Sequence, residues 1–291
     1  YGRAHPCYLA TGWKSKAGEE RRLTVRVLLT NDDGIHAPGL EALCRELSAM
    51  PELELYVVAP DRERSASGHA ITLHKPLYAQ PARLPGSSAP AWSINGTPAD
   101  CTKIGISALM PSPPELVISG INRGANLGIN VLYSGTVSAA IEGVLLGVPS
   151  LAVSLAALDQ GDFTPAARFV GHFLKLLIKR GNPGFRLLNI NVPDRPLEAI
   201  RGVAVTRLSN RRYVDSFVRR TDPRGRTYYW LSGELEEEDR DPATDAGALH
   251  HGFISVTPLH LNLTDTSLMD SLGQWRPELD ALFLRSDPPS A

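Results

Sequence analysis

The chain has little cysteine, almost no net charge and no long apolar run. Its three cysteines, Cys7, Cys44 and Cys101, form no C-x-x-C pair, which argues against a disulfide framework or a zinc ribbon and fits a reducing cytosol. A net charge of −1 produces no global field that would attract nucleic acid or an anionic membrane. No apolar stretch is long enough to cross a bilayer. We therefore expect a cytoplasmic protein with neither a membrane partner nor stable nucleic-acid binding.

The sequence also shows neither a signal-peptide pattern nor a dinucleotide-binding motif. Residues 1–20 lack the apolar segment of a signal peptide and are polar and aperiodic, so we expect residues 1–22 to be a flexible N-terminal extension. No G-x-G-x-x-G follows the first expected strand, so the dinucleotide-binding fingerprint is missing. The 43% hydrophobic content of 291 residues is nevertheless enough for a sizeable core.

The most informative stretch that is present is an apolar run ending in two carboxylates. Residues 25–29 are typical of a parallel strand that is covered on both faces, and Asp32 and Asp33 follow it. Open α/β sheets bind ligands at this carboxyl end. Two neighbouring carboxylates are costly to bury, and a hard divalent cation such as Mg²⁺ or Mn²⁺ would compensate for them. On this stretch alone, a simple turn before a helix is an equally good interpretation.

Strand and helix patterns alternate along the first two thirds of the chain. Strand-like runs occupy residues 25–30, 53–59, 115–119, 150–155 and 185–192, and helical patterns occupy residues 40–50, 97–110, 136–146 and 164–181. Residues 70–79 have the character of an edge strand, and residues 80–91 that of a surface loop. The order predicts an α/β fold, with a Rossmann-like, doubly wound and mostly parallel sheet, in residues 23–200.

The composition changes beyond residue 193. Arginine is concentrated there, and a turn signal at residues 222–225 lies between two strand-like runs. The arginines could indicate RNA binding, but the acidic run at residues 234–241 offsets them. We expect residues 201–264 to form a hairpin and oligomerisation arm with a final strand, and residues 265–291 a C-terminal tail. A hairpin that is poorly stable alone favours a homodimer or homotetramer.

Polar side chains follow three of the expected parallel strands. Asp32 and Asp33 follow the first, Ser65 the second and Asn122 the third, and these oxygen atoms suit one hard cation completed by water. The loop of Asn122 ends in Ser134, Gly135 and Thr136 at a helix N-terminus, an arrangement that binds anions. A cation beside a phosphate site suggests metal-assisted phosphoryl hydrolysis. Each piece alone also has a simpler interpretation as a helix cap or a turn.

Three more side chains are weaker candidates. His36 and His69 lie in the same loops and could protonate a leaving alkoxide, although most such histidines are structural or plain loop residues. Arg123 could bind a phosphate or bridge carboxylates. Cys101, at the start of a helix, is more typical of a core residue than of a nucleophile.

Several ordered segments resemble the SurE family of metal-dependent survival-protein nucleotidases, and together they run from about residue 25 to residue 263. The matching segments are TNDDG at 30–34, VAPDRERSASGH at 58–69, NGTPADC at 95–101, SGINRGAN at 119–126, SGTVSAA at 134–140, LNINVP at 188–193 and ISVTPL at 254–259. The departures are the N-terminal segment and a Pro/Ser-rich insertion near residues 85–90. The resemblance implies that Asp32, Asp33, Ser65 and Asn122 hold the metal.

The resemblance also implies an activity. The expected enzyme is a metal-dependent 5′-nucleotidase with one Mg²⁺ or Mn²⁺ per subunit. The cation would polarise the phosphoryl group of a nucleoside monophosphate and activate water for in-line attack. Activity on 3′-monophosphates or polyphosphates is left open. A phosphatase with an Asp nucleophile of the haloacid dehalogenase type would need a spaced Asp-x-Asp pattern, which is absent. The alternative outside enzymes is a nucleotide-binding stress protein that does not hydrolyse.

Overall fold

The computed structural model describes residues 24–157, 159–210, 213–235 and 239–283. The chain divides into two units, Tyr1–Leu259 and His260–Ala291, and each is described here by itself. The first unit holds the sheet and every predicted site residue, so it carries the functional argument.

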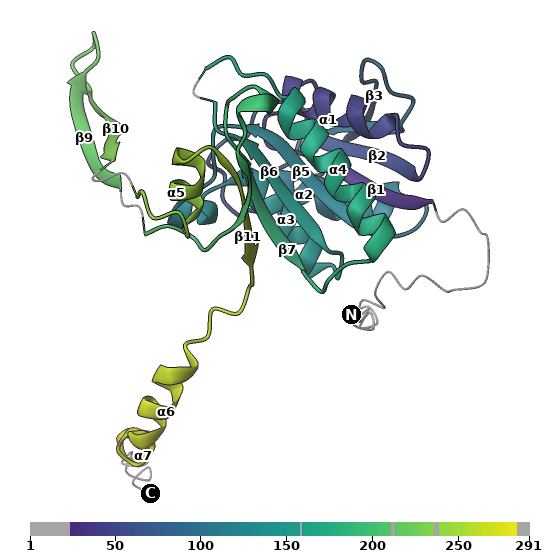
Figure 1. The fold of residues 1–291 in the computed structure, drawn as a ribbon. Coiled ribbons are helices and arrows are strands. Elements are labelled where there is room, and N and C mark those ends of the chain that lie inside the picture. The colour runs from purple at the N-terminus through teal and green to yellow at the C-terminus, as the bar shows by residue number, and fades with distance from the viewer. Residues whose placement is uncertain (1–23, 158, 211–212, 236–238, 284–291) are drawn as a thin grey trace, which may run out of the picture. The chain divides into compact units, whose positions relative to one another are not determined.

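A nine-stranded sheet forms the centre of the first unit (Figure 1). Its strands are β1 (Val25–Thr30), β2 (Leu53–Pro60), β3 (Ala79–Ala82), β4 (Ala91–Ile94), β5 (Leu116–Arg123), β6 (Ser150–Leu155), β7 (Leu187–Val192), β8 (Gly202–Val205) and β11 (Phe253–Leu259). They lie in the order β3-β4-β2-β1-β5-β6-β7-β11-β8. Within this sheet the β3–β4 and β7–β11 pairs are antiparallel, and the other neighbours are parallel. The prediction of a mostly parallel α/β sheet is confirmed.

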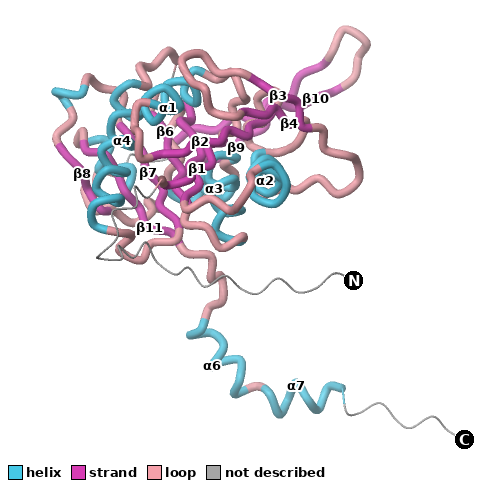
Figure 2. Tube along the Cα trace, turned by 90° about the vertical axis from the view of Figure 1, so that its right-hand side faces the viewer, coloured by secondary structure: helices cyan, strands magenta, loops and turns pink. Residues whose placement is uncertain are grey.

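Helices cover both faces of this sheet (Figures 1 and 2). Helices α1 (Pro38–Ser48) and α4 (Thr164–Arg180) lie on one face. Helices α2 (Pro98–Ile104), continued by a π-helical turn at Gly105–Leu109, and α3 (Gly135–Leu145) lie on the other. A large apolar cluster therefore packs under α1 and α4, and a smaller one, which includes the fully buried Cys101, packs next to α2. Cys101 is thus a core residue.

The helix starts follow the signals in the sequence. The Thr97 hydroxyl accepts a hydrogen bond from the Asp100 N–H, and the Asp100 carboxylate accepts one from the Thr97 N–H, which makes a complete capping box with Pro98 at the first helical position. The Ser134 hydroxyl accepts from the Val137 N–H and caps α3 in the same way. These local bonds explain why α2 and α3 begin where predicted.

The edge of the sheet differs from the prediction. Residues 70–79 are irregular except for Ala79, which begins β3, so the predicted strand there is wrong. Strand β3 instead lies mostly in the segment expected to be a loop, residues 80–91, and β4 begins at its last residue, Ala91. The reason lies in α2, because Thr72 gives its backbone N–H and its hydroxyl to Asp100, which removes it from any strand pairing.

Residues beyond 200 contribute both to the sheet and to a separate hairpin. Strands β8 and β11 belong to the nine-stranded sheet, and α5 (Asp245–His250) precedes β11. Strands β9 (Tyr213–Thr221) and β10 (Thr227–Leu235) form a two-stranded antiparallel sheet of their own. Their turn is held by Asp222, whose carboxylate accepts the N–H groups of Arg224 and Arg226. The predicted hairpin is confirmed, and its role in oligomerisation stays a prediction.

The second unit contains helices α6 (Thr266–Gln274) and α7 (Arg276–Phe283). The Asp265 carboxylate accepts the Ser267 and Leu268 N–H groups and caps α6. Short 3₁₀ turns at Gly128–Leu132 and Leu197–Ala199 complete the secondary structure of the described chain. Within the described residues, no helix combines the length and apolarity needed to cross a membrane.

The core packing of α4 can be tested with two leucines of the same helix. Leu174 is fully buried, whereas Leu176 is 47% exposed. Leu174→Ala should lower the free energy of unfolding by about 2–5 kcal/mol because it leaves a cavity in the core. Leu176→Ala should change it by less than about 0.5 kcal/mol. Urea unfolding of both variants measures the difference, and equal losses would contradict this packing.

The hairpin can be tested through an exposed apolar pair. Phe217 and Leu231 are cross-strand partners and are 68% and 63% exposed. We expect a second copy of the chain to cover them, because aromatic side chains are enriched at interfaces and lone hairpins are marginally stable. The double variant Phe217→Ser/Leu231→Ser should therefore sediment as a smaller species than the parent, while Thr221→Ser should not. A parent protein that sediments as a monomer at micromolar concentration would contradict the prediction.

Candidate active site

The predicted ligands lie together at the point where the strand order of the sheet reverses. Strand β1 lies between β2 and β5, so the connections from β1 and from β5 leave in opposite directions and open a crevice at their carboxyl ends. A pocket of about 570 Å³ occupies this place. Its lining includes all four predicted metal ligands, which are Asp32, Asp33, Ser65 and Asn122.

Asp32 is the most enclosed member of this group. Its side chain is 4% exposed, and its Oδ1 accepts a 2.5 Å hydrogen bond from the Thr136 hydroxyl. Burial raises the pKa of Asp32, while the hydroxyl and the backbone N–H of Thr136 oppose that rise. A Cβ atom at Gly135 would lie 2.7 Å from the Asp32 Cβ. Glycine is therefore required there to bring the first turn of α3 against the carboxylate.

Asp33 is half-buried beside Asp32. Burial, and after it the charge of Asp32, raise the pKa of Asp33 to about 6. The backbone N–H and the guanidinium charge of Arg123 act in the opposite direction. Both pKa values are raised, so the surrounding groups offset only part of the cost of burying two adjacent negative charges. A bound cation would supply the missing positive charge.

Ser65 and Asn122 face the same pocket with neutral oxygen atoms. The Ser65 hydroxyl donates to Glu63 Oε1 at 2.6 Å, which leaves the lone pairs of its oxygen available. The Asn122 amide nitrogen donates to the Gly124 and Arg123 carbonyls at 2.7 and 3.2 Å. The Asn122 Oδ1 atom is thus the one available to a cation. A register shift in the β5–β6 pairing between Ser119 and Asn122 accompanies this placement.

This donor set fits a hard cation and does not fit zinc. Among the described residues, no three His, Cys, Asp or Glu side chains form a metal-binding group. The pocket instead offers two carboxylates with a hydroxyl and an amide oxygen, and Mg²⁺ or Mn²⁺ would complete such a shell with water. Glu63, which the sequence analysis did not select, adds a third carboxylate to the lining. Its position two residues before Ser65 in the segment that resembles the family was the signal that could have found it.

The predicted phosphate site has two components in the structure. Ser134 lines the pocket and caps α3 through its hydroxyl. Thr136 is fully buried, and its hydroxyl donates to Asp32. The first turn of α3 therefore contacts Asp32 directly, through the Thr136 hydroxyl. Phosphate binding by Ser134, Gly135 and Thr136 stays a prediction.

The two candidate histidines do not line the pocket. His36 is exposed to solvent, and the His69 Nε2 lies 3.0 Å from Glu142 Oε2. Arg123 does line the pocket, and its positive charge opposes the rise in the pKa of Asp33. An acid role for either histidine stays a prediction.

The lining also includes residues that the sequence analysis missed, namely Asn126, Asn130, Tyr133 and Phe163. The loop at Asn126 is fixed by β7, because Asn191 Oδ1 accepts the Asn126 N–H at 2.8 Å, and the Asn189 amide donates to the Asn126 carbonyl at 2.8 Å. The alternating Asn residues of β7 are the sequence signal for this support. These four residues add amide and aromatic groups to the lining.

Taken together, the crevice at the switch point, the paired carboxylates and the capped helix form the candidate active site of an α/β hydrolase. The family model described as Survival protein SurE matches residues 27–215. The chain belongs to the SurE family.

Curated relatives and a solved structure agree with this assignment. The protein named 5′-nucleotidase SurE from Symbiobacterium thermophilum is 54% identical over 249 residues, which cover 86% of this chain and 97% of that protein. The 5′-nucleotidase SurE of Heliobacterium modesticaldum is 51% identical over 251 residues, covering 86% and 92%. The crystal structure of the SurE protein from Aquifex aeolicus matches with a TM-score of 0.74 and 38% identity, covering 86% of this chain and 99% of that one.

The contact between Thr136 and Asp32 can be tested with two substitutions. Thr136→Val removes the hydroxyl, so a buried carboxylate oxygen loses its donor, and the free energy of unfolding should fall by about 1–3 kcal/mol. Thr136→Ser keeps the hydroxyl and should stay near the parent value. Urea unfolding measures stability, and inhibition by inorganic phosphate measures anion binding. If Thr136→Val weakens phosphate inhibition without any loss of stability, the main role of the Thr136 hydroxyl is to bind the anion, and its contact with Asp32 is not important for stability.

Proposed function

We propose that this chain is a metal-dependent 5′-nucleotidase that hydrolyses nucleoside monophosphates to nucleoside and phosphate. The observation that carries the proposal is the pair Asp32 and Asp33 in the wall of a 570 Å³ pocket, with the Asp33 pKa raised to about 6. The relatives that bear the name 5′-nucleotidase SurE support the reaction class. The pocket is large enough for a nucleotide-sized ligand.

We assign the cation to Asp32, Asp33, Ser65 and Asn122. When bound there, Mg²⁺ or Mn²⁺ would stabilise charge on the phosphoryl oxygens and activate water as the nucleophile. The chain's own residues provide the rest. Thr136 orients the Asp32 carboxylate, and the Arg123 N–H orients that of Asp33. Arg123, beside them in the lining, supplies a guanidinium that can bind phosphate in a bidentate manner.

The substrate is proposed to lie in this pocket, in contact with two groups of lining residues. Its phosphate would lie at the carboxylates and near the N-terminus of α3, where Ser134 and the free N–H groups of the first turn favour an anion. Its nucleoside would lie towards Asn126, Asn130, Tyr133 and Phe163. Amide groups and an aromatic ring suit a nucleobase, which offers both hydrogen-bonding edges and a stacking face.

The reaction can be tested directly with AMP. The purified protein should release phosphate from AMP in the presence of Mn²⁺, and excess EDTA should abolish the release. Parallel assays with 3′-AMP and a short polyphosphate determine whether those substrates are also cut. Binding of AMP without phosphate release under any divalent cation would instead favour a nucleotide-binding protein that does not hydrolyse.

The carboxylate pair can be tested by neutral substitution. Asp33→Asn should lower kcat/KM for AMP at least about 100-fold, because several kcal/mol of cation-dependent stabilisation are lost. The metal-free variant should be at least as stable as the parent, since a like-charge contact with Asp32 disappears. Asp194→Asn, at an exposed position outside the lining, is the control. Phosphate release and thermal unfolding together check this, and near-normal turnover of Asp33→Asn would contradict the assignment.

A further inference from the structure

The connection between β2 and β3 supplies part of the active-site wall without any regular structure of its own. Residues 61–78 contain neither helix nor strand, and most of them are exposed. Glu63, Ser65 and Ala66 of this segment nevertheless line the pocket. We call residues 61–78 the Ser65 loop. Its backbone must be held by contacts with other elements, because a free loop of this length would adopt many conformations.

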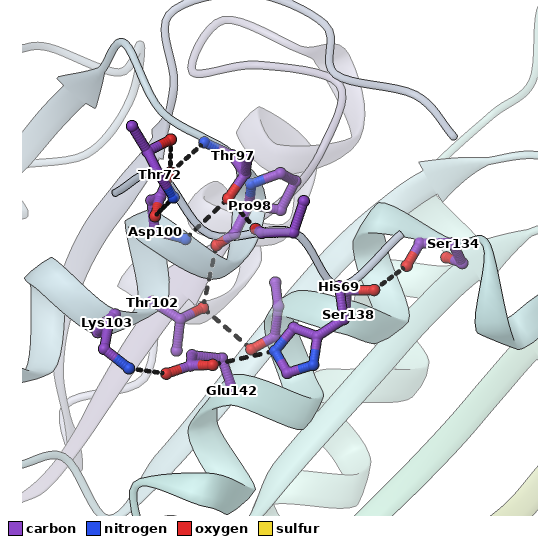
Figure 3. A network of polar contacts seen from close by, with 12 residues as sticks. His69, Thr72, Thr97, Pro98, Asp100, Thr102, Lys103, Ser134, Ser138 and Glu142 are labelled. Carbon is purple, nitrogen blue, oxygen red and sulfur yellow. Dashed lines mark hydrogen bonds and ion pairs between the residues drawn. The ribbon is translucent and has the colours of Figure 1, made fainter. Parts of the chain in front are cut away.

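Backbone contacts hold the loop near the pocket. The Arg64 N–H donates to the Asp32 carbonyl at 2.7 Å, and the Gly68 N–H donates to the Tyr133 carbonyl at 3.1 Å. Further along, Thr72 gives its N–H and its hydroxyl to the Asp100 carboxylate at 2.9 and 2.6 Å (Figure 3). These anchors leave His69 between them.

His69 joins the loop to α3 through a buried carboxylate. Its Nε2 lies 3.0 Å from Glu142 Oε2, and the Lys103 Nζ lies 2.6 Å from Glu142 Oε1 (Figure 3). The Glu142 side chain is only 3% exposed, whereas those of His69 and Lys103 are 30% and 49% exposed. A carboxylate buried to this degree is expensive without partners, so Glu142 restrains the more exposed groups that contact it.

Helix α3 therefore contacts both halves of the metal site. In its first turn, Thr136 orients Asp32. Further along the same helix, Glu142 holds His69 and with it the loop of Ser65. A rigid helix that fixes two ligand-bearing segments sets their separation.

We propose that His69, through Glu142, is a positioning residue for the cation site. Its role is to hold the Ser65 loop so that the Ser65 hydroxyl faces Asp32 and Asp33. This rests on the proposed function, which makes Ser65 a metal ligand. The bond to Glu142 and the absence of His69 from the pocket lining both separate it from the acid role that its place in the sequence suggested.

The positioning role predicts a change in the affinity for the cation and little change in kcat. Without the His69 contact, the loop keeps only its other anchors, and the cation must supply the rest of the ordering free energy, so affinity for the cation falls. Once the cation is bound, the site has its normal composition, and kcat at saturating Mn²⁺ should remain within about twofold of the parent. A residue that protonates the leaving group would show the opposite pattern, with cation affinity retained and kcat reduced by about 10²–10⁴-fold.

The experiment is calorimetric titration of Mn²⁺ into the metal-depleted, full-length protein. His69→Ala should raise the Kd for Mn²⁺ about 10-fold, as is typical when a partner of a metal ligand is removed. His69→Gln offers an amide N–H to Glu142 and should restore most of the affinity. His74→Ala removes an exposed histidine of the same loop and should leave the Kd unchanged.

A second control distinguishes an effect on the Ser65 loop from a general effect on the Glu142 carboxylate. Lys103→Gln perturbs Glu142 on the side away from His69 and should change the Kd for Mn²⁺ less than His69→Ala does. Thermal unfolding of each metal-depleted variant checks that the fold is intact, and Glu142→Gln provides an independent weakening of the same contact if His69→Ala does not fold. An unchanged Kd in folded His69→Ala would overturn the positioning role while leaving the nucleotidase proposal intact. A parent protein that binds no Mn²⁺ would overturn both.

Discussion

The active site depends on the cost of holding two adjacent carboxylates at the edge of a parallel sheet. Burial raises the pKa values of both Asp32 and Asp33, and the charge of Asp32 raises that of Asp33 further. The protein offsets only part of this cost, through the Thr136 hydroxyl and the Arg123 N–H. A bound cation, as proposed above, would offset the remainder, and the neutral oxygens of Ser65 and Asn122 lie in the same pocket.

Helix α3 connects this site to the rest of the fold. Gly135 lets its first turn approach Asp32, and the capping bond of Ser134 determines where the helix begins. Its buried Glu142 then extends the influence of the helix to an irregular loop through His69. Helix α3 thus contacts both Asp32, which follows β1, and the loop that follows β2. A helix is suited to this because its internal hydrogen bonds make it stiff.

Much of the fold and part of the site could be predicted from local patterns. The apolar run before Asp32 and the helical segments that begin at Thr97 and Thr164 each depend on neighbours in the sequence, and each was predicted correctly. Residues 70–79 were mistaken for a strand because the partner of Thr72 is Asp100, far along the chain. The role of Asn126 in the pocket lining was missed for the same reason, since Asn126 is supported by Asn191 from β7.

The sequence by itself determined the alternation of strands and helices, the helix caps and the segments that bring Asp32, Asp33, Ser65 and Asn122 towards one sheet edge. Those features follow from side-chain periodicity and from bonds between near neighbours. Only the tertiary structure decided that the Thr136 hydroxyl contacts Asp32 and that His69 contacts Glu142 outside the pocket. The physical reason is that a hydrogen bond between distant residues depends on how two elements pack, and local sequence does not encode that packing.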